Sequence, residues 1–173
     1  MANLSVYSHN YILDSLETVT ANKNLKSLAV AERIPVVILV AFLYEAIANH
    51  YGCIVHGTYK GWKKASSKKS PIEKIEKLYA SKGVEIDFHK HPFTTLRSVF
   101  SIRNAVAHSK THSMVMDQKV KKGELPEPSW IIQLKSLDLD VAINDQKLML
   151  KNLPALLGLE QVPSLILSEV RCS

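Results

Sequence analysis

Apolar residues recur at the spacing of amphipathic helices along most of this 173-residue chain. From residue 10 to 31 the pattern predicts one or two short helices. The most apolar stretch follows, and we expect a long helix that starts around Pro35 and runs to about Tyr51, with Gly52 as its stop. Glu45 interrupts this stretch, which is shorter than the ~20 residues needed to cross a bilayer. We therefore interpret it as the most buried helix.

Two further helices carry recognisable signals. Ser70, Pro71 and Glu73 have the order of an N-cap, a first helical residue and the reciprocal partner of a capping box, so we expect a helix there that Gly83 ends. A third helical pattern covers residues 92–109. It has apolar residues on one side and polar residues in its last turns.

The segments around these helices differ in composition. Glycine, lysine and serine dominate residues 55–70, which predicts a loop, and residues 84–92 form a connector. Residues 119–129 contain a glycine and two prolines and predict a second loop. Residues 130–134 can start as a short strand, before helical spacing returns over 137–153.

Together these patterns predict an all-α fold. We expect one domain over residues 1–173, an antiparallel helical bundle with its core at about residues 34–153. Pro154 and later proline and glycine residues predict a loop-rich C-terminal extension over 154–173. The composition, 46% hydrophobic and 22% charged, is that of a globular protein.

Cysteine and histidine spacing argues against metal and redox chemistry. Cys53 and Cys172 are far apart, so we expect reduced thiols in a reducing compartment. The first residues lack the basic and apolar regions of a secretory signal, which favours a cytoplasmic protein without a membrane segment. His89 and His91 have no further ligand nearby in the sequence. We therefore expect neither a metal nor another cofactor.

Positive charge is concentrated in the middle of the chain. Residues 58–122 hold fifteen basic and five acidic side chains, whereas the segments on both sides are slightly acidic. A local basic field of this kind suits a phosphate-bearing partner such as RNA. A solvated lysine-rich loop is the alternative interpretation, and we prefer it for residues 60–69 taken alone.

The segment from Arg103 to His108 holds the strongest candidates for catalysis. Histidine can take the proton from a ribose 2′-hydroxyl or give one to the leaving 5′-oxygen, and arginine can stabilise charge on the phosphate. Helical spacing makes Asn104 and His108 neighbours, so that Asn104 can orient His108, and turns Arg103 away. The same residue types at a helix end can equally cap free carbonyl groups.

The sequence from Leu96 to Lys110 resembles the signature helix of the HEPN superfamily, whose mark is an arginine, four to six residues, and a histidine. Here the form is Arg-Asn-x-x-Ala-His. The resemblance covers residues 34–153 and implies a helical bundle that forms a homodimer. Arg103, Asn104 and His108 of each chain would then form half of a composite ribonuclease site.

The resemblance also implies an activity and a setting. Metal-independent endoribonucleases of this kind attack with the 2′-hydroxyl and leave 2′,3′-cyclic phosphate and 5′-hydroxyl ends. Many act as toxins or in defence, with an antitoxin or another regulatory protein as partner. Other members are non-catalytic dimers that bind RNA or protein. A third interpretation is a partner-binding module unrelated to RNA, in which the basic region only keeps the protein soluble.

Several other residues are candidates for supporting roles. Arg97, Lys110 and His112 can line the cleft and contact phosphates, although a solvated helix end also explains the last two. Glu45 can pair with Arg103 and hold it, or face solvent. Trp62 and Tyr59 can stack on RNA bases, or anchor their loop onto the bundle. The anchoring role is the one that we expect.

Overall fold

The computed structural model describes residues 8–108 and 127–159, and in these ranges the chain is helical, with turns and no strand. The predicted all-α class is confirmed. In chain order the elements are α1 (Ser8–Thr20), the short 3₁₀ helix η1 (Leu25–Ser27), α2 (Val30–Val55), α3 (Tyr59–Ala65), α4 (Pro71–Ala80), α5 (Leu96–Ala107), α6 (Ser129–Ser136) and α7 (Leu139–Leu156).

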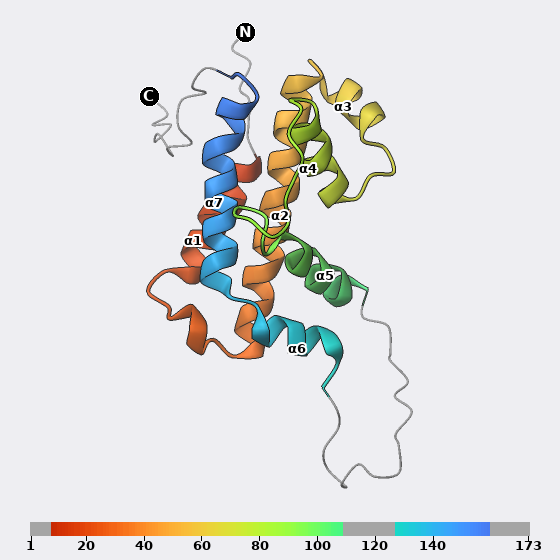
Figure 1. Cartoon of the computed structure of the whole chain (residues 1–173). Helices are drawn as coiled ribbons and strands as arrows, with labels where there is room; N and C mark the ends of the chain where they lie inside the picture. The colour runs from red at the N-terminus through yellow and green to blue at the C-terminus, as the bar shows by residue number, and fades with distance from the viewer. Residues whose placement is uncertain (1–7, 109–126, 160–173) are drawn as a thin grey trace, which may run out of the picture.

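Helix α2 is the centre of the molecule. It contacts each of the other six α-helices of the described chain. Helices α1 and α7 lie along one side of it, α3, α4 and α5 lie on the other, and α6 crosses near its start (Figure 1). Because its two sides face different neighbours, α2 separates two environments, and the candidate site lies on the side of α4 and α5.

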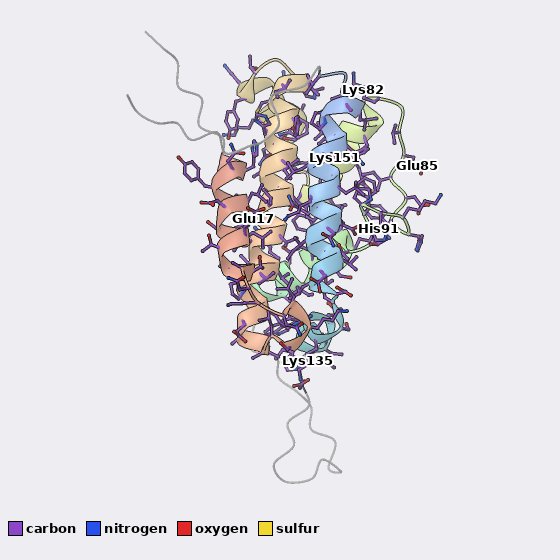
Figure 2. The ribbon with its side chains drawn as sticks, turned by 90° about the vertical axis from the view of Figure 1, so that its left-hand side faces the viewer. Glu17, Lys82, Glu85, His91, Lys135 and Lys151 are labelled. Atoms are coloured by element: carbon purple, nitrogen blue, oxygen red, sulfur yellow. The ribbon has the colours of Figure 1, made fainter. Side chains whose placement is uncertain are left out.

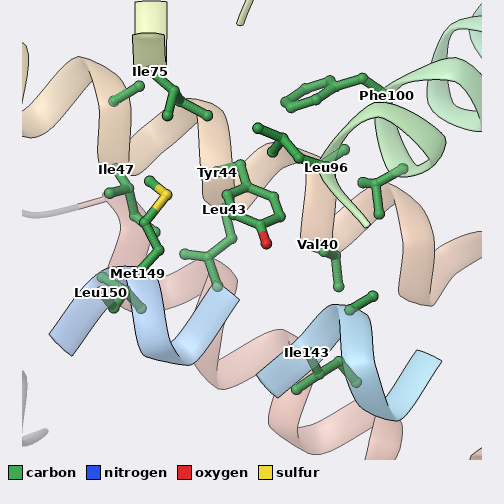
Figure 3. Packing of buried hydrophobic residues seen from close by; sticks show 14 of the residues in the cluster. Val40, Leu43, Tyr44, Ile47, Ile75, Leu96, Phe100, Ile143, Met149 and Leu150 are labelled. Carbon is green, nitrogen blue, oxygen red and sulfur yellow. The ribbon is translucent and has the colours of Figure 1, made fainter. Parts of the chain in front are cut away.

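The hydrophobic core joins α2 to helices on both of these sides (Figure 3). Burying one large aliphatic or aromatic side chain stabilises the fold by roughly 1.5–3 kcal/mol relative to leaving it in water. The side chains around α2 that fill this core are Val40, Leu43, Tyr44 and Ile47 of α2, Ile75 of α4, Leu96 and Phe100 of α5, and Ile143, Met149 and Leu150 of α7.

The bounds of α2 differ from the predicted ones at both ends. It begins five residues before Pro35, because Glu32 accepts a hydrogen bond from the backbone N–H of Ala29 at 3.1 Å and so completes the first turn. Gly52 does not stop the helix. Its place inside α2 lets the ring of Trp62 pack against the backbone, since a Cβ atom there would lie 2.2 Å from the ring.

The predicted loop over 55–70 is also wrong, because it contains α3. Thr58 caps this helix by accepting a hydrogen bond from the N–H of Gly61 at 3.0 Å. Trp62 is 1% exposed and its Nε1 donates to Asn49 Oδ1 at 3.1 Å. Burial of this one side chain holds a short, lysine-rich helix on α2.

Two expectations for the second half of the chain need correction. Residues 130–134 lie in helix α6, not in a strand, and Leu134 of α6 is buried. Pro154 does not begin the extension, because α7 continues through it to Leu156. A proline in a last turn removes only one hydrogen bond, and burial of Leu153 and Leu157 keeps that turn on the bundle. By contrast, the capping box of Ser70 and Glu73 is present as predicted.

Arg33, in the first turns of α2, connects three parts of the chain. It is 6% exposed, and its Nε donates to the carbonyl of Leu134 at 3.0 Å and its Nη1 to that of Leu25 at 3.2 Å. Its Nη2 donates to the carbonyl of Leu137. These carbonyls belong to η1, the last turns of α6 and the residue that follows α6. One side chain therefore holds the start of α2 against both segments.

The connector between α4 and α5 is attached to α7 by a polar cluster. His91 lies at the surface of the connector, beside α7 (Figure 2), and its Nδ1 pairs with the buried carboxylate of Asp145. Thr94 and Thr95 donate to the other oxygen of this carboxylate at 2.7 and 3.2 Å. Among the described residues no group of three or more His, Cys, Asp or Glu side chains is placed to hold a metal ion.

A pair of histidines lies between α1 and α2. The ring centroids of His9 and His50 are 4.6 Å apart, and His9 is buried. Burial, together with the neighbouring His50, lowers the pKa of His9 from its ordinary value of 6.5 to about 4. Burial also lowers the pKa of His50. Both rings are therefore neutral at pH 7.

Candidate functional site

Helix α5 directs Arg103 toward α2. The guanidinium Nη2 lies 4.0 Å from Glu45 Oε2, so the pairing considered from the sequence is present. Its Nη1 donates to Asn104 Oδ1 at 3.0 Å, and its central carbon lies 5.7 Å from the centre of the Phe42 ring. The side chain keeps a quarter of its surface exposed. Arg103 is thus held by three neighbours and still accessible to a ligand.

Glu45 has a second cationic partner. Its Oε1 accepts a hydrogen bond from Lys74 Nζ of α4 at 3.3 Å. One carboxylate therefore lies between two cations from different helices, and the group keeps one net positive charge. We call Phe42, Glu45, Lys74, Arg103 and Asn104 the Arg103 cluster.

His108 follows the last residue of α5 and is exposed. Its backbone N–H donates to the carbonyl of Asn104 at 2.9 Å, which closes the last turn of the helix. Its imidazole has no hydrogen-bond partner in the described part of the chain. A histidine in this position is free to meet a substrate.

The expected contact between the Asn104 side chain and His108 is not the one that forms. Asn104 Oδ1 accepts from Arg103 instead, and hydrogen bonds from a charged guanidinium are stronger than those between neutral groups. In addition, α5 ends at Ala107, so His108 has left helical geometry, with φ −115° and ψ 32°. Asn104 therefore orients Arg103, and nothing among the described residues orients His108.

Of the three supporting candidates from the same region, the structure describes only Arg97. The guanidinium of Arg97 lies over the ring of Phe88, 3.8 Å from its centre, and so contacts the connector and is not part of the Arg103 cluster. Lys110 and His112 lie outside the described residues. Of the predicted catalytic set, Arg103 and Asn104 lie in α5 and His108 directly follows it, and no hydrogen bond joins Arg103 to His108 in the described ranges.

The two aromatic residues of α3 have different roles. Trp62 is buried against Gly52 and Asn49, so it is an anchor and offers no surface to a base. Tyr59 is 67% exposed, and its possible stacking role stays a prediction. Lysines of α3 and of the turn after it are exposed on the side of α2 that also carries α4 and α5 (Figure 1). The positive charge of α3 therefore lies on the side of α2 that also carries the Arg103 cluster.

Sequence reasoning missed two members of the cluster, Phe42 and Lys74. Phe42 precedes Glu45 by three residues, a spacing that places both on one face of a helix. That spacing was a usable signal once Glu45 had been paired with Arg103. Lys74 carried no such signal, because only the packing of α4 on α2 brings it to Glu45.

The chain matches no family model, no curated protein and no solved structure. In the described ranges, no helix combines the length and the apolar character needed to cross a bilayer. The chemistry of the site must therefore be argued from its own geometry. A fixed, accessible guanidinium can bind a phosphate oxygen, and an exposed histidine at the end of the same helix can transfer a proton.

Proposed function

We propose that this protein is a metal-independent endoribonuclease. In this proposal the 2′-hydroxyl of RNA attacks the adjacent phosphate, and the products carry 2′,3′-cyclic phosphate and 5′-hydroxyl ends. His108 takes the proton from the 2′-hydroxyl or gives one to the 5′-oxygen that leaves as its bond to phosphorus breaks. Arg103 stabilises the charge that develops on the phosphate. The observation that carries the proposal is the partly exposed guanidinium of Arg103, which is held by Asn104 and Glu45.

The proposed active form is a homodimer. Arg103 pairs with Glu45 of α2 and His108 lies beyond the end of α5, and no hydrogen bond joins the two side chains in the described part of the chain. A second copy can supply the missing partner to each, as the resemblance to HEPN proteins implies. The site would then be composite, with residues of both chains around one phosphate.

Cleavage assays with defined variants test the nuclease proposal. Wild-type protein in EDTA should cleave RNA and leave cyclic phosphate ends. Arg103→Ala and His108→Ala should each lose activity by roughly 100- to 10,000-fold while keeping the circular dichroism and melting temperature of the wild type. His89→Ala is the matched control, because His89 is also an exposed histidine outside a helix but lies in the connector before α5 and is not part of the Arg103 cluster. Equal cleavage by wild type and His108→Ala would exclude the mechanism.

Mixing the two inactive variants tests the dimer separately. If the arginine and the histidine of one site come from different chains, Arg103→Ala and His108→Ala proteins will restore part of the activity when refolded together. Each mixed dimer then contains one intact site. Activity in the wild type without any restoration in the mixture would retain the nuclease and reject the site shared between chains.

One observation favours the non-catalytic alternative. Glu45 neutralises part of the charge of Arg103, and no described residue orients His108. A dimer that binds RNA without cutting it needs only positive charge such as that of the Arg103 cluster. RNA binding that weakens steeply with salt, without any product, would establish this second function.

A further inference from the structure

Phe42 is a member of the Arg103 cluster that the proposed reaction does not use. Its ring is 42% exposed, although Ala41 and Leu43 beside it in α2 are fully buried. A single exposed ring is common on protein surfaces and needs no explanation by itself. Its position matters here, because the ring lies next to the guanidinium that we assign to phosphate binding.

The geometry matches the two ends of a nucleotide. The guanidinium carbon of Arg103 lies 5.7 Å from the centre of the ring. A ribose separates the phosphate and the base of a nucleotide by a distance of the same order. A phosphate on Arg103 therefore brings its base within reach of Phe42. Glu45 and Asn104 fix the guanidinium, so the spacing between the phosphate contact and the ring is set before any RNA binds.

We propose that Phe42 is a stacking platform for one base of the RNA, beside the phosphate bound by Arg103. This proposal rests on the proposed function. Aromatic side chains bind bases through their flat faces with little regard to sequence. The base must be unstacked from its neighbours to reach the ring, so the substrate class is single-stranded RNA or a loop. Duplex RNA keeps its bases stacked and would not use this contact.

Binding to an oligonucleotide that cannot be cut isolates the stacking contact from cleavage. The probe is a single-stranded oligonucleotide with 2′-O-methyl groups at every position, and the readout is its Kd by fluorescence anisotropy. Phe42→Ala and Phe42→Leu should each weaken binding by roughly 5- to 150-fold, the range found when a stacking residue is truncated. Phe42→Trp should retain wild-type affinity, because it keeps a flat aromatic face.

Two controls separate stacking from general effects. Tyr11→Leu changes an aromatic residue with 66% exposure on α1, and should leave Kd unchanged. A duplex of the same sequence should bind Phe42→Leu and wild type equally. An abasic nucleotide at the contact position should weaken wild-type binding and leave Phe42→Leu binding as it is.

The remaining outcomes decide between this proposal and its competitors. Equal affinity of Phe42→Leu and wild type would overturn the platform. Conversion of the dimer to a monomer by Phe42→Leu, seen by sedimentation, would make Phe42 an interface residue and also overturn it. Absence of nucleic-acid binding by the wild type would reject the platform together with RNA recognition. Phe42-dependent binding without cleavage of unmodified RNA would retain the platform and reject the nuclease.

Discussion

Arg33 near the start of α2 and Arg103 near the end of α5 differ in what their guanidinium groups contact. Arg33 is buried and donates only to backbone carbonyls, those of Leu25, Leu134 and Leu137. Arg103 is partly exposed and meets side chains, a carboxylate, an amide oxygen and an aromatic ring.

This difference separates a residue that holds the fold from one suited to a ligand. Backbone carbonyls cannot leave Arg33 without unfolding the turns that carry them, and a buried donor or acceptor left without its partner is costly. The partners of Arg103 are side chains, and they leave a quarter of the Arg103 side chain exposed to meet a phosphate. We therefore expect substitutions around Arg33 to change stability, and substitutions around Arg103 to change RNA binding and cleavage.

The largest expected effect is on the stability of Arg33→Ala. Three carbonyls lose their donor, which should lower the free energy of unfolding by about 3 kcal/mol or more. Arg103→Ala breaks a partly exposed ion pair and should cost less than about 1 kcal/mol. Urea denaturation of the two variants measures the difference. Similar losses of unfolding free energy in both variants would contradict the distinction between Arg33 and Arg103.

Acid should lower the stability of the fold through protonation of His9. Its lowered pKa means that the unfolded chain takes up a proton below pH 6.5 while the folded chain resists until about pH 4. Stability is therefore complete above about pH 6.5 and is lost as the pH falls toward 4, by on the order of 3 kcal/mol. Denaturation at pH 7.5, 5.5 and 4 checks this. His9→Gln should lose less stability with acid than the wild type. If the free energy of unfolding of this variant depends on pH as that of the wild type does, another group is responsible for the effect.

Gly52→Ala tests whether the contact between α2 and α3 stabilises the fold, as the contacts of Arg33 do. The new methyl group would overlap the Trp62 ring and should cost about 1–3 kcal/mol. The cost should fall when Trp62→Leu is present in the same protein, because the overlapping ring is gone. A double-mutant cycle on thermal or urea unfolding measures this coupling. Additive effects of the two substitutions would show that the Trp62 ring is not the reason why position 52 needs a glycine.

The smallest expected change in stability is that of Glu45→Gln, within about 1 kcal/mol. The effect of Glu45→Gln on RNA should be larger than its effect on stability, and it should differ between binding and cleavage. Removal of a negative charge beside Arg103 and Lys74 should strengthen RNA binding, whereas loss of the carboxylate that fixes Arg103 should slow cleavage. Kd and the single-turnover rate, measured on the same RNA, separate the two. Weaker binding together with slower cleavage would mean that fixing Arg103 matters more than the charge.

Local signals explain why some elements were predictable. The start of α4 is encoded within four residues, since Ser70 and Glu73 bond to each other's backbone and Pro71 already has helical geometry. The all-α class followed in the same way from the spacing of apolar residues. Capping hydrogen bonds and amphipathic spacing involve near neighbours, so the sequence carries them without knowledge of the fold.

The candidate site was only partly encoded in this way. Its candidate catalytic residues, Arg103 and His108, are found in one motif, and Glu45 was a possible partner of Arg103. The motif could not show that Asn104 bonds to Arg103 and not to His108, because that choice depends on where α5 ends and on competition between donors.

By itself, the sequence determined the helical class, the start of α4 and the concentration of positive charge in the middle of the chain, and it supplied Arg103 and His108 as candidates. Only the tertiary structure decided that residues 59–65 form a helix, that Gly52 is a packing position, and that Lys74 and Phe42 join Arg103. The physical reason is the range of the interactions. A cap or a helical period acts within a turn or two, whereas the Trp62 ring and the charges around Glu45 meet their partners only after helices distant in the chain have packed.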